Sequence, residues 1–438
     1  MTGFARRRQR VLELLGPDGA MVLAAAPEIV VGRDLELRYV VDPDLWYLTG
    51  YPEPEAVAVL CGGPEPSYTL FVRPRDPERE TWTGPRQGVE KAVEEFGADA
   101  AYPIAELGQR LHELLRSVDR VHFRIGAGRP DIEHAVLDVM GKGRARRQRS
   151  GVGPVELTDP GLILDDMRLT KEPEEVAAIR DAVTVTAQAF RHALAAARPG
   201  AGEWEIEALT EGAMRRAGAD GPAFATIAAS GANATVLHYT ANDRRMEQGD
   251  LLLLDAGARH RIYNADLTRT VPVSGRFTAP QRDVYQVVLD AEQAAVDAAR
   301  PGATTADVHR AAVATLVRGM VDLGLLQGDP DSLAQQEEHW KRWYPHNTSH
   351  WLGLDVHDVG TYGVRGEPRR LEPGMVMTIE PGLYIPADAT NAPGHLQGIG
   401  IRIEDDILIT DHGAEVLSSA LPTDPEDVER LVGDQPTS

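Results

Sequence analysis

The chain has 438 residues, a formal net charge of −22 at pH 7 and 42% hydrophobic residues. This length and apolar content suit a soluble protein of two domains, each with its own core. The acidic excess repels nucleic acid and anionic membranes, and no apolar run approaches the roughly 20 residues of a membrane helix, so we expect no nucleic-acid or membrane partner.

Short apolar runs alternate with helical patterns over the first part of the chain. The patterns predict helices over Ala5–Leu15, Glu90–Phe96 and Ile104–Ser117, and strands over Ala20–Ala25, Ala56–Leu60, Tyr68–Val72 and Val121–Ile125. Alternation of this kind is typical of an α/β domain. The segment Gly151–Asp166 is rich in Gly, Pro and Asp and has no clear period. It predicts a boundary between a domain of residues 1–165 and a domain of residues 166–438.

The second domain mixes both element types. A helical pattern over Pro173–Ala197 starts with acidic residues, which the helix dipole favours at that end. The later patterns predict strands over Leu251–Ala256, Ile262–Val273, Met375–Ile379 and Ile399–Ile409, helices over Ala279–Ala299 and Thr305–Leu323, and a polar surface loop or irregular helix over Gln327–Trp343. The expected fold class is therefore α/β (α+β).

Three carboxylates lie at the ends of very apolar strands. Asp255 follows four leucines, Glu380 follows Met375–Ile379, and Glu404 follows Ile399–Ile403. A buried carboxylate is costly unless it is paired or binds a metal ion. Three such acids in one domain therefore predict a metal site.

Asp266 is expected to belong with Asp255. If the segment Leu251–Val273 is a hairpin that turns at His260-Arg261, Asp255 and Asp266 are equidistant from the turn and face each other. Opposed like charges destabilise a hairpin unless a cation lies between them. This geometry predicts a metal ion bound by both.

Histidines are concentrated in one stretch, HNTSHWLGLDVHD, which holds His346, His350 and His357, and a further one, His238, lies far away in the sequence. Neutral imidazole is a common metal ligand, and histidine also serves as acid, base or hydrogen-bond donor near neutral pH. No HExxH pattern is present, which excludes a zincin helix. Arg402 lies two residues before Glu404, so both side chains should face the same side of a strand, where Arg402 could steady a ligand.

Five motifs then stand in register: LLLLDAGA, NADLTRT, HNTSHWLGLDVHDVG, LEPGMVMTIEPGLYI and GIGIRIEDD. Together they resemble the pita-bread metallopeptidases (family M24B), in the branch that contains aminopeptidase P and the Xaa-Pro dipeptidases. RDLELRYVVDPDLWYLTGYPEPEAVAVL and RDPERETWTGPRQG also resemble the N-terminal domain of aminopeptidase P. The resemblance implies a creatinase-like α/β domain followed by a catalytic pita-bread domain, and it covers nearly the whole chain.

Position by position, the resemblance implies which residues act. Two divalent metal ions, of which Mn²⁺ suits an oxygen-rich site with one imidazole, would be bound by Asp255, Asp266, His350, Glu380 and Glu404. Asp266 and Glu404 would serve both ions. Glu380 would also transfer a proton, His357 would stabilise the oxyanion, His238 would orient the substrate, and His346 and Arg402 would lie behind the ligands or face the substrate.

The implied activity is release of the N-terminal residue from peptides with proline at position two. An Xaa-Pro dipeptidase with the same metal site remains the alternative, and a metal-free binding or scaffold protein of this fold is the alternative from another class. The resemblance further implies a homo-oligomer, a dimer or tetramer, in which Trp82 and Asp44 reach a neighbouring subunit's cleft.

Two departures from the family pattern concern loops. Asn347 stands where the family commonly has glycine, and we expect it to tolerate left-handed backbone angles. The turn over Arg259–Ile262 lacks the glycine expected in a tight hairpin.

Cysteine usage and the N-terminus indicate the compartment. The single cysteine, Cys61, cannot form an internal disulfide, which suits a reducing environment. Glu13, Pro17 and Asp18 interrupt the first apolar stretch, so the pattern is not that of a signal peptide. We expect a cytoplasmic protein.

Overall fold

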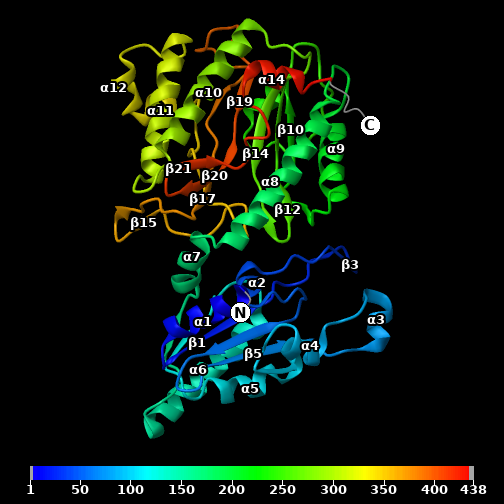
Figure 1. The fold of residues 1–438 in the computed structure, drawn as a ribbon, viewed down its shortest axis with the longest axis vertical. Helices are drawn as coiled ribbons and strands as arrows, with labels where there is room; N and C mark the ends of the chain where they lie inside the picture. The colour runs from blue at the N-terminus through cyan, green and yellow to red at the C-terminus, as the bar shows by residue number, and fades with distance from the viewer. Residues whose placement is uncertain (1–2, 434–438) are drawn as a thin grey trace. The chain divides into compact units, whose positions relative to one another are not determined.

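The computed structural model describes residues 3–433, and its contacts divide the chain into two compact units, residues 1–166 and 167–438. The first unit is built on a six-stranded mixed sheet with the order β6-β5-β4-β1-β7-β8 (Figure 1). In it, β1, β4 and β5 pair antiparallel, whereas β6, β7 and β8 join in parallel. Its elements are α1 (Gly3–Leu15), β1 (Gly19–Ala24), β2 (Val30–Val31), β3 (Leu35–Glu36), α2 (Pro43–Thr49), β4 (Val57–Cys61), β5 (Ser67–Val72), α3 (Pro77–Thr83), α4 (Gly88–Glu94), β6 (Ala100–Pro103), η1 (Ile104–Glu106), α5 (Leu107–Leu114), β7 (Arg120–His122), α6 (Pro130–Ser150) and β8 (Glu156–Thr158).

The second unit packs long helices around several short antiparallel sheets, with orders β10-β11-β14, β13-β12-β9, β17-β20-β21, β18-β19 and β15-β16. Helix α7 (Gly161–Leu169) spans the division between the units. The remaining elements are α8 (Pro173–Leu194), α9 (Glu203–Arg216), β9 (Gly221–Pro222), β10 (Ile227–Ser230), η2 (Gly231–Thr235), β11 (Leu251–Ala256), β12 (Ala258–His260), β13 (Tyr263–Asn264), β14 (Leu267–Pro272), α10 (Ala279–Ala298), α11 (Thr305–Asp322), α12 (Pro330–Ala334), α13 (Glu337–Trp340), β15 (Gly363–Val364), β16 (Glu367–Pro368), β17 (Val376–Ile379), β18 (Gly382–Ile385), β19 (Ile399–Arg402), β20 (Asp405–Thr410), β21 (Gly413–Val416) and α14 (Pro425–Arg430).

Three long helices of the second unit have N-termini that are fixed by their local sequence. Helices α8, α10 and α11 each start with a capping box, in which an N-cap side chain and the side chain three residues later satisfy each other's backbone N–H groups. For α10 the pair is Thr278 and Gln281. The helices predicted for these regions are confirmed, with ends that differ by a few residues.

The hairpin that carries the two aspartates differs from the expectation. Asp255 pairs with Thr268 in the β11–β14 ladder, so the predicted direct pairing of Asp255 with Asp266 is wrong. The turn is centred between Arg261 and Ile262, whose φ angles are 50° and 74°, as a two-residue turn with two left-handed positions requires. Asp266 is consequently a diagonal neighbour of Asp255, a spacing that still lets the two side chains interact.

Three further expectations need correction. The polar segment Gln327–Trp343 forms the short helices α12 and α13, and it buries Trp340 and Trp343 rather than lying wholly on the surface. Asn347 does not adopt a positive φ, so this position requires no left-handed backbone. The predicted strand over Ile399–Ile409 is interrupted between Arg402 and Asp405, where the chain passes from β19 to β20.

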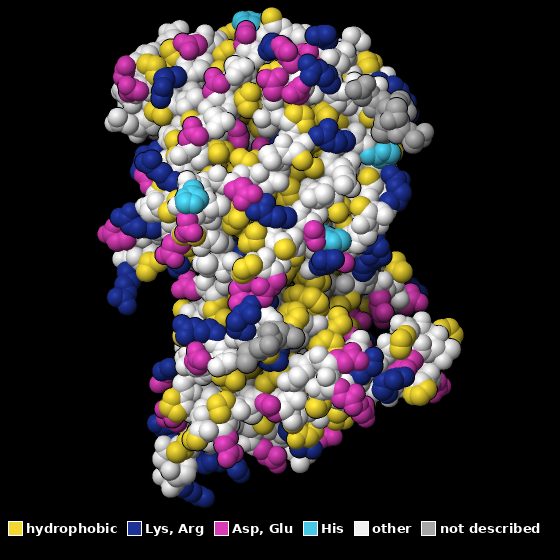
Figure 2. All heavy atoms as spheres, viewed as in Figure 1, with side chains coloured by type: hydrophobic (Ala, Val, Ile, Leu, Met, Phe, Trp, Pro, Cys, Tyr) yellow, Lys and Arg dark blue, Asp and Glu magenta, His cyan; other side chains and the backbone are white. Residues whose placement is uncertain are grey.

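The visible part of the surface shows how the charges are distributed. On the face shown in Figure 2, Asp and Glu side chains are interspersed with Lys and Arg. Within residues 3–433, no helix has the length and apolar character needed to cross a membrane.

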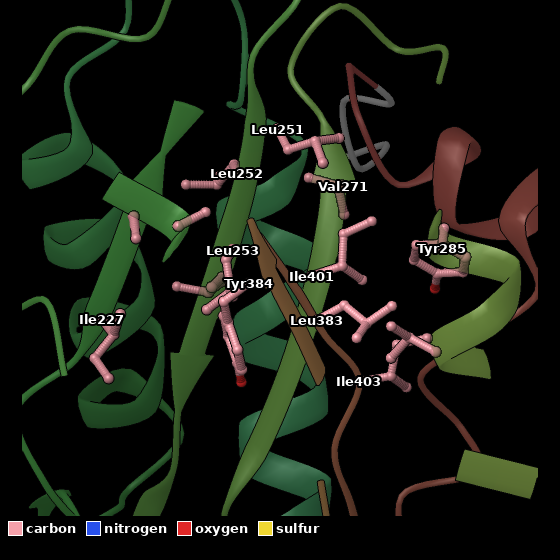
Figure 3. Packing of buried hydrophobic residues seen from close by; sticks show 14 of the residues in the cluster. Ile227, Leu251, Leu252, Leu253, Val271, Tyr285, Leu383, Tyr384, Ile401 and Ile403 are labelled. Carbon is pink, nitrogen blue, oxygen red and sulfur yellow. The ribbon is translucent and has the colours of Figure 1, made fainter. Parts of the chain in front are cut away.

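The main core of the second unit lies behind the acidic residues. Leu251, Leu252 and Leu253 of β11 pack with Val271 of β14 and Ile401 of β19 (Figure 3). Tyr384 of β18 joins this cluster with its ring while its hydroxyl points away from it. The apolar strands β11 and β19 thus carry Asp255 and Arg402 at their ends.

Candidate active site

All nine residues predicted for the site line one cavity of about 1180 Å³ in the second unit. Three of the five predicted ligands lie at or just after the ends of the buried strands β11, β17 and β19, and a fourth, Asp266, directly precedes β14. The fifth, His350, lies in the irregular segment before β17 and hydrogen-bonds that strand through Thr378. The full set is Asp255, Asp266, His350, Glu380 and Glu404, with His238, His346, His357 and Arg402 around them.

Three of the predicted ligands form a compact group. Potential ligand atoms of Asp266, His350 and Glu404 all lie within 4.8 Å of one another. Nε2 of His350 is 3.3 Å from Oδ2 of Asp266 and 3.8 Å from Oε1 of Glu380. One imidazole and several carboxylate oxygens therefore converge on a single space, as the ligands of a divalent cation do.

The electrostatics of this group call for a cation. Burial raises the pKa of Asp266, and the carboxylates of Asp255 and Asp406 raise it further. Burial likewise raises the pKa of Glu404, with Asp266 adding to the effect. Burial also raises the pKa of Glu380, to about 7. Carboxylates placed this closely in a dry site repel one another unless positive charge lies between them.

The tautomer of His350 also favours a bound cation. Its Nδ1 lies 3.0 Å from the carbonyl oxygen of Trp351 and can donate to it. The lone pair of Nε2 then faces the carboxylates of Asp266 and Glu380. A lone pair directed at anions is unfavourable by itself, whereas the same arrangement orients an imidazole to bind a metal ion. The residues present fit a divalent metal.

Asp255 stands beside this group and is held by arginine. Nη2 of Arg402 forms a short ion pair with Oδ2 of Asp255, and the buried Oδ1 has no hydrogen-bond partner in the described chain. Arg402 also donates through Nε to the hydroxyl of Thr268, 3.1 Å away, and that hydroxyl lies 2.7 Å from Oε2 of Glu404. The predicted role of Arg402 next to the ligands therefore has a direct geometric basis.

A hydrogen-bonded chain links Arg402 to His346 through a residue that the sequence reasoning missed. Nη1 of Arg402 lies 3.0 Å from the Tyr384 hydroxyl, which lies 2.8 Å from Nε2 of His346. Burial lowers the pKa of His346 to about 4, so the ring is neutral and its Nε2 accepts from Tyr384. Tyr384 pairs with Gly400 in the β18–β19 ladder, and this register brings it diagonally next to Arg402. Only the strand pairing could have singled it out.

The remaining histidines face the cavity. The ring of His357 lies 4.4 Å from that of His350. Burial lowers the pKa of His357, and the imidazoles of His350 and His238 lower it further, which places all three rings in one neighbourhood. His238 lies in the irregular segment between η2 and β11. The cavity wall continues through Phe224 and Leu237 on one side and through His309 of α11 and the β15–β16 hairpin on another.

Comparison with known proteins places the chain among peptidases. A family model described as metallopeptidase family M24 matches residues 177–411, and one described as aminopeptidase P, N-terminal domain, matches residues 4–122. The Xaa-Pro aminopeptidase of Escherichia coli (strain K12) is 42% identical over 436 residues, which cover 98% of this chain and 97% of that protein.

Solved structures agree with the sequence comparison. Aminopeptidase PepP of Pseudomonas aeruginosa matches with a TM-score of 0.94 and 43% identity, covering 98% of this chain and 97% of that one. An alanine variant of Escherichia coli aminopeptidase P in complex with substrate matches with a TM-score of 0.93, 41% identity and the same coverage. The expected fold, an aminopeptidase P-type N-terminal domain followed by a pita-bread metallopeptidase domain, is confirmed.

Proposed function

This chain belongs to metallopeptidase family M24, and on that premise we propose that it is an aminopeptidase that releases the N-terminal residue from peptides with proline at position two. The observation that carries the proposal is the convergence of Asp266, His350 and Glu404, with Asp255 and Glu380 beside them, in one cavity. Relatives of this name match the chain over both units and nearly their whole length, which favours this activity over that of a dipeptidase. We place the division between the two domains at residues 165 and 166.

Two divalent cations, for which Mn²⁺ is the best candidate, are the proposed cofactor. Asp255, Asp266, His350, Glu380 and Glu404 would bind them, and the oxygen-rich set with one imidazole favours Mn²⁺ over metals that prefer sulfur. When bound, such ions polarise a peptide carbonyl and lower the pKa of water.

The protein's own groups would then handle binding and protons. The carboxylate of Asp255, whose Oδ1 has no hydrogen-bond partner among the described residues, would bind a metal and help attract the free α-amine of the substrate; an internal peptide bond has no such amine to offer. Glu380, whose pKa is raised to about 7 by burial, would take a proton and return it to the proline nitrogen. Its Oε2 lies 3.6 Å from Nδ1 of the neutral His346 ring.

His357 and His238 would act on the substrate from the cavity side. Both line the cavity, and neither makes a hydrogen bond within the described residues that would occupy its ring. His357 would stabilise negative charge on the carbonyl oxygen, and His238 would orient the peptide. The chain from Arg402 through Tyr384 would hold His346 neutral and in place.

The decisive experiment compares substrates. The purified chain, freed of metal and then supplied with Mn²⁺, is expected to cleave Xaa-Pro-Yaa tripeptides far faster than Xaa-Pro dipeptides or peptides with alanine at position two. A strong preference for the dipeptide would establish a dipeptidase instead. No activity and no bound metal after Mn²⁺ addition would establish a scaffold protein.

A pair of variants tests the ligand assignment. Asp266→Ala is expected to lose bound metal and activity together, because Asp266 would serve both ions. His346→Ala should keep its metal and lose only part of the activity. Equal loss of metal in the two variants contradicts the assignment.

The setting of the enzyme is proposed as well. We place it in the cytoplasm, as a homo-oligomer (a dimer or tetramer), with peptides rather than nucleic acid as partners. Trp82 of α3 is 87% exposed, which supports a role at a neighbouring subunit. Asp44 is instead buried within the first unit and lies 3.2 Å from Arg124, so we propose that role for Trp82 alone. The oligomer is tested by light scattering of wild type and Trp82→Ala.

A further inference from the structure

One carboxylate outside the site, Glu203, is fully buried and yet belongs to no ion pair within residues 3–433. It is the first residue of α9, which lies beside β10 (Figure 1), and none of its surface is exposed. A buried carboxylate persists only where enough donors replace its lost water. The hydrogen-bond donors around Glu203 therefore indicate which part of the chain this carboxylate holds in place.

Both oxygens of Glu203 accept hydrogen bonds from one segment of chain, residues 230–244. Oε1 accepts from the backbone N and the hydroxyl of Ser230, each at 2.7 Å, and from the amide of Asn233 at 3.1 Å. Oε2 accepts from the hydroxyl of Tyr239 at 2.8 Å and from the backbone N of Arg244 at 2.9 Å. The five donors are spread over the whole segment, so one carboxylate binds both ends and the middle of residues 230–244.

The same segment has a few other anchors: Asn242 hydrogen-bonds the backbone of Thr226 and Ala228, and the Arg244 side chain donates to Ser230 and Asp250. After η2 ends at Thr235, the chain forms no helix or strand until β11 begins at Leu251, apart from an isolated bridge at Arg245. The backbone N of Glu203 donates to the carbonyl of Arg244 at 2.9 Å, which closes a second link to the same place. The early part, at Ala234, packs tightly on the backbone of Gly400.

This segment carries His238. The ring of His238 makes no hydrogen bond to any residue between 3 and 433 that would fix it, and Leu237 and Thr240 on either side also line the cavity. Its position therefore depends on the backbone of residues 230–244. The neighbouring Tyr239 is the member of the segment that reaches back to Glu203.

We propose that Glu203 is a positioning residue that sets the placement of His238 in the cavity. The expected effect on catalysis rests on the proposed function, in which His238 orients the substrate. The anchoring of residues 230–244 by Glu203 does not depend on the proposed function, because it follows from the five hydrogen bonds.

Glu203→Gln tests the proposal with the smallest change of shape. An amide nitrogen cannot accept, so the donors now facing one of the two carboxylate oxygens lose their partner. We expect kcat/KM on a proline-containing tripeptide to fall by roughly tenfold or more, with unchanged metal content. Glu211→Gln is the matched control, because Glu211 lies on the same helix and accepts one hydrogen bond, from Thr226, outside the segment.

A double-mutant cycle with His238→Ala makes the test specific. If Glu203 acts through His238, Glu203→Gln should change kcat/KM by less than about twofold once His238 is absent. Losses that multiply, or a His238→Ala variant as active as wild type, overturn the proposal. Should Glu203→Gln not fold, Tyr239→Phe removes one donor only, and its smaller loss should also vanish in the His238→Ala background.

Hydrogen exchange separates this proposal from the proposed function. Amides of residues 231–247 are expected to exchange faster in Glu203→Gln than in wild type and Glu211→Gln, whether or not the wild type cleaves any peptide. Unchanged exchange there refutes the positioning role. Inactivity of wild type on proline peptides, with the exchange result as expected, refutes the proposed function alone.

Discussion

A buried charge cluster beneath the loop of His357 allows a quantitative prediction. Nζ of Lys171 and Nη2 of Arg168 lie 3.1 Å and 2.6 Å from the two oxygens of Asp358, and all three side chains are almost completely buried. Lys171→Met keeps the apolar stem but removes the ammonium group. Breaking a buried pair typically costs about 3–5 kcal/mol, but Arg168 remains on the other oxygen. We therefore expect a loss of about 2 kcal/mol, near the value of one charge-assisted hydrogen bond.

The assay is urea unfolding of four proteins: wild type, Lys171→Met, Asp358→Asn and the double variant. Because the two residues share one hydrogen bond, the double variant should be more stable than the sum of the single losses predicts, by about 1–2 kcal/mol. Lys341→Met is the control, since Lys341 and Glu337 form a largely exposed pair that should contribute under about 0.5 kcal/mol. A coupling energy between Lys171 and Asp358 no larger than the whole stability change caused by Lys341→Met refutes the reasoning.

The pH dependence of this cluster has a defined sign. Burial alone would raise the pKa of Asp358, but Lys171 and Arg168 hold it below its ordinary value. A carboxyl whose pKa is lower in the folded state stabilises the fold above its unfolded pKa, near 4, and loses that effect as pH falls through the folded value. The penalty of Lys171→Met should thus persist at pH 5–8 and shrink in acid.

Three further predictions concern separate features. Because burial raises the pKa of Glu380 to about 7, Mn²⁺ binding should release protons and weaken as pH falls below 7; calorimetry in two buffers measures this, and equal release by Glu380→Gln contradicts it. Ile262→Gly relieves a left-handed β-branched residue and should raise stability by about 1 kcal/mol in thermal unfolding, whereas Ile262→Val should not. Burial and the nearby Asp405 raise the pKa of Glu292 to about 8, so the wild type loses stability as pH rises from about 4.5 to 8. The free energy of unfolding of Glu292→Gln should therefore exceed that of wild type by about 2 kcal/mol or more at pH 9 and equal it at pH 4.5. An equal gain at both pH values contradicts this prediction.

Strand ends were the most informative feature of the sequence. Asp255, Glu380 and Glu404 were selected because acids rarely follow runs such as Leu251–Leu254 without a reason, and the structure brings all three to one cavity. Local periodicity suffices for such positions, since a buried strand fixes where its end lies. The choice of His350 among three nearby histidines depended instead on resemblance.

What the sequence could not reveal depended on pairing across the chain. The hairpin register was misplaced because neither Arg261 nor Ile262 carries the usual signal of a left-handed turn. Tyr384, Lys171 and Glu203 act on partners that are remote in sequence, which no spacing rule reaches. Helix α6 was also missed, because its second half, with Gly141 and Gly143, is polar on most sides.

The cavity is lined by two different kinds of structure. The predicted ligands lie on or next to buried strands, whereas Gly363, Gly366, Glu367 and Pro368, which also line the cavity, belong to the exposed β15–β16 hairpin. Insertions, deletions and exchanges are tolerated in such hairpins far better than in a packed sheet. The hairpin is thus the natural place to graft new substrate selectivity by loop exchange, while the ligand residues stay unchanged.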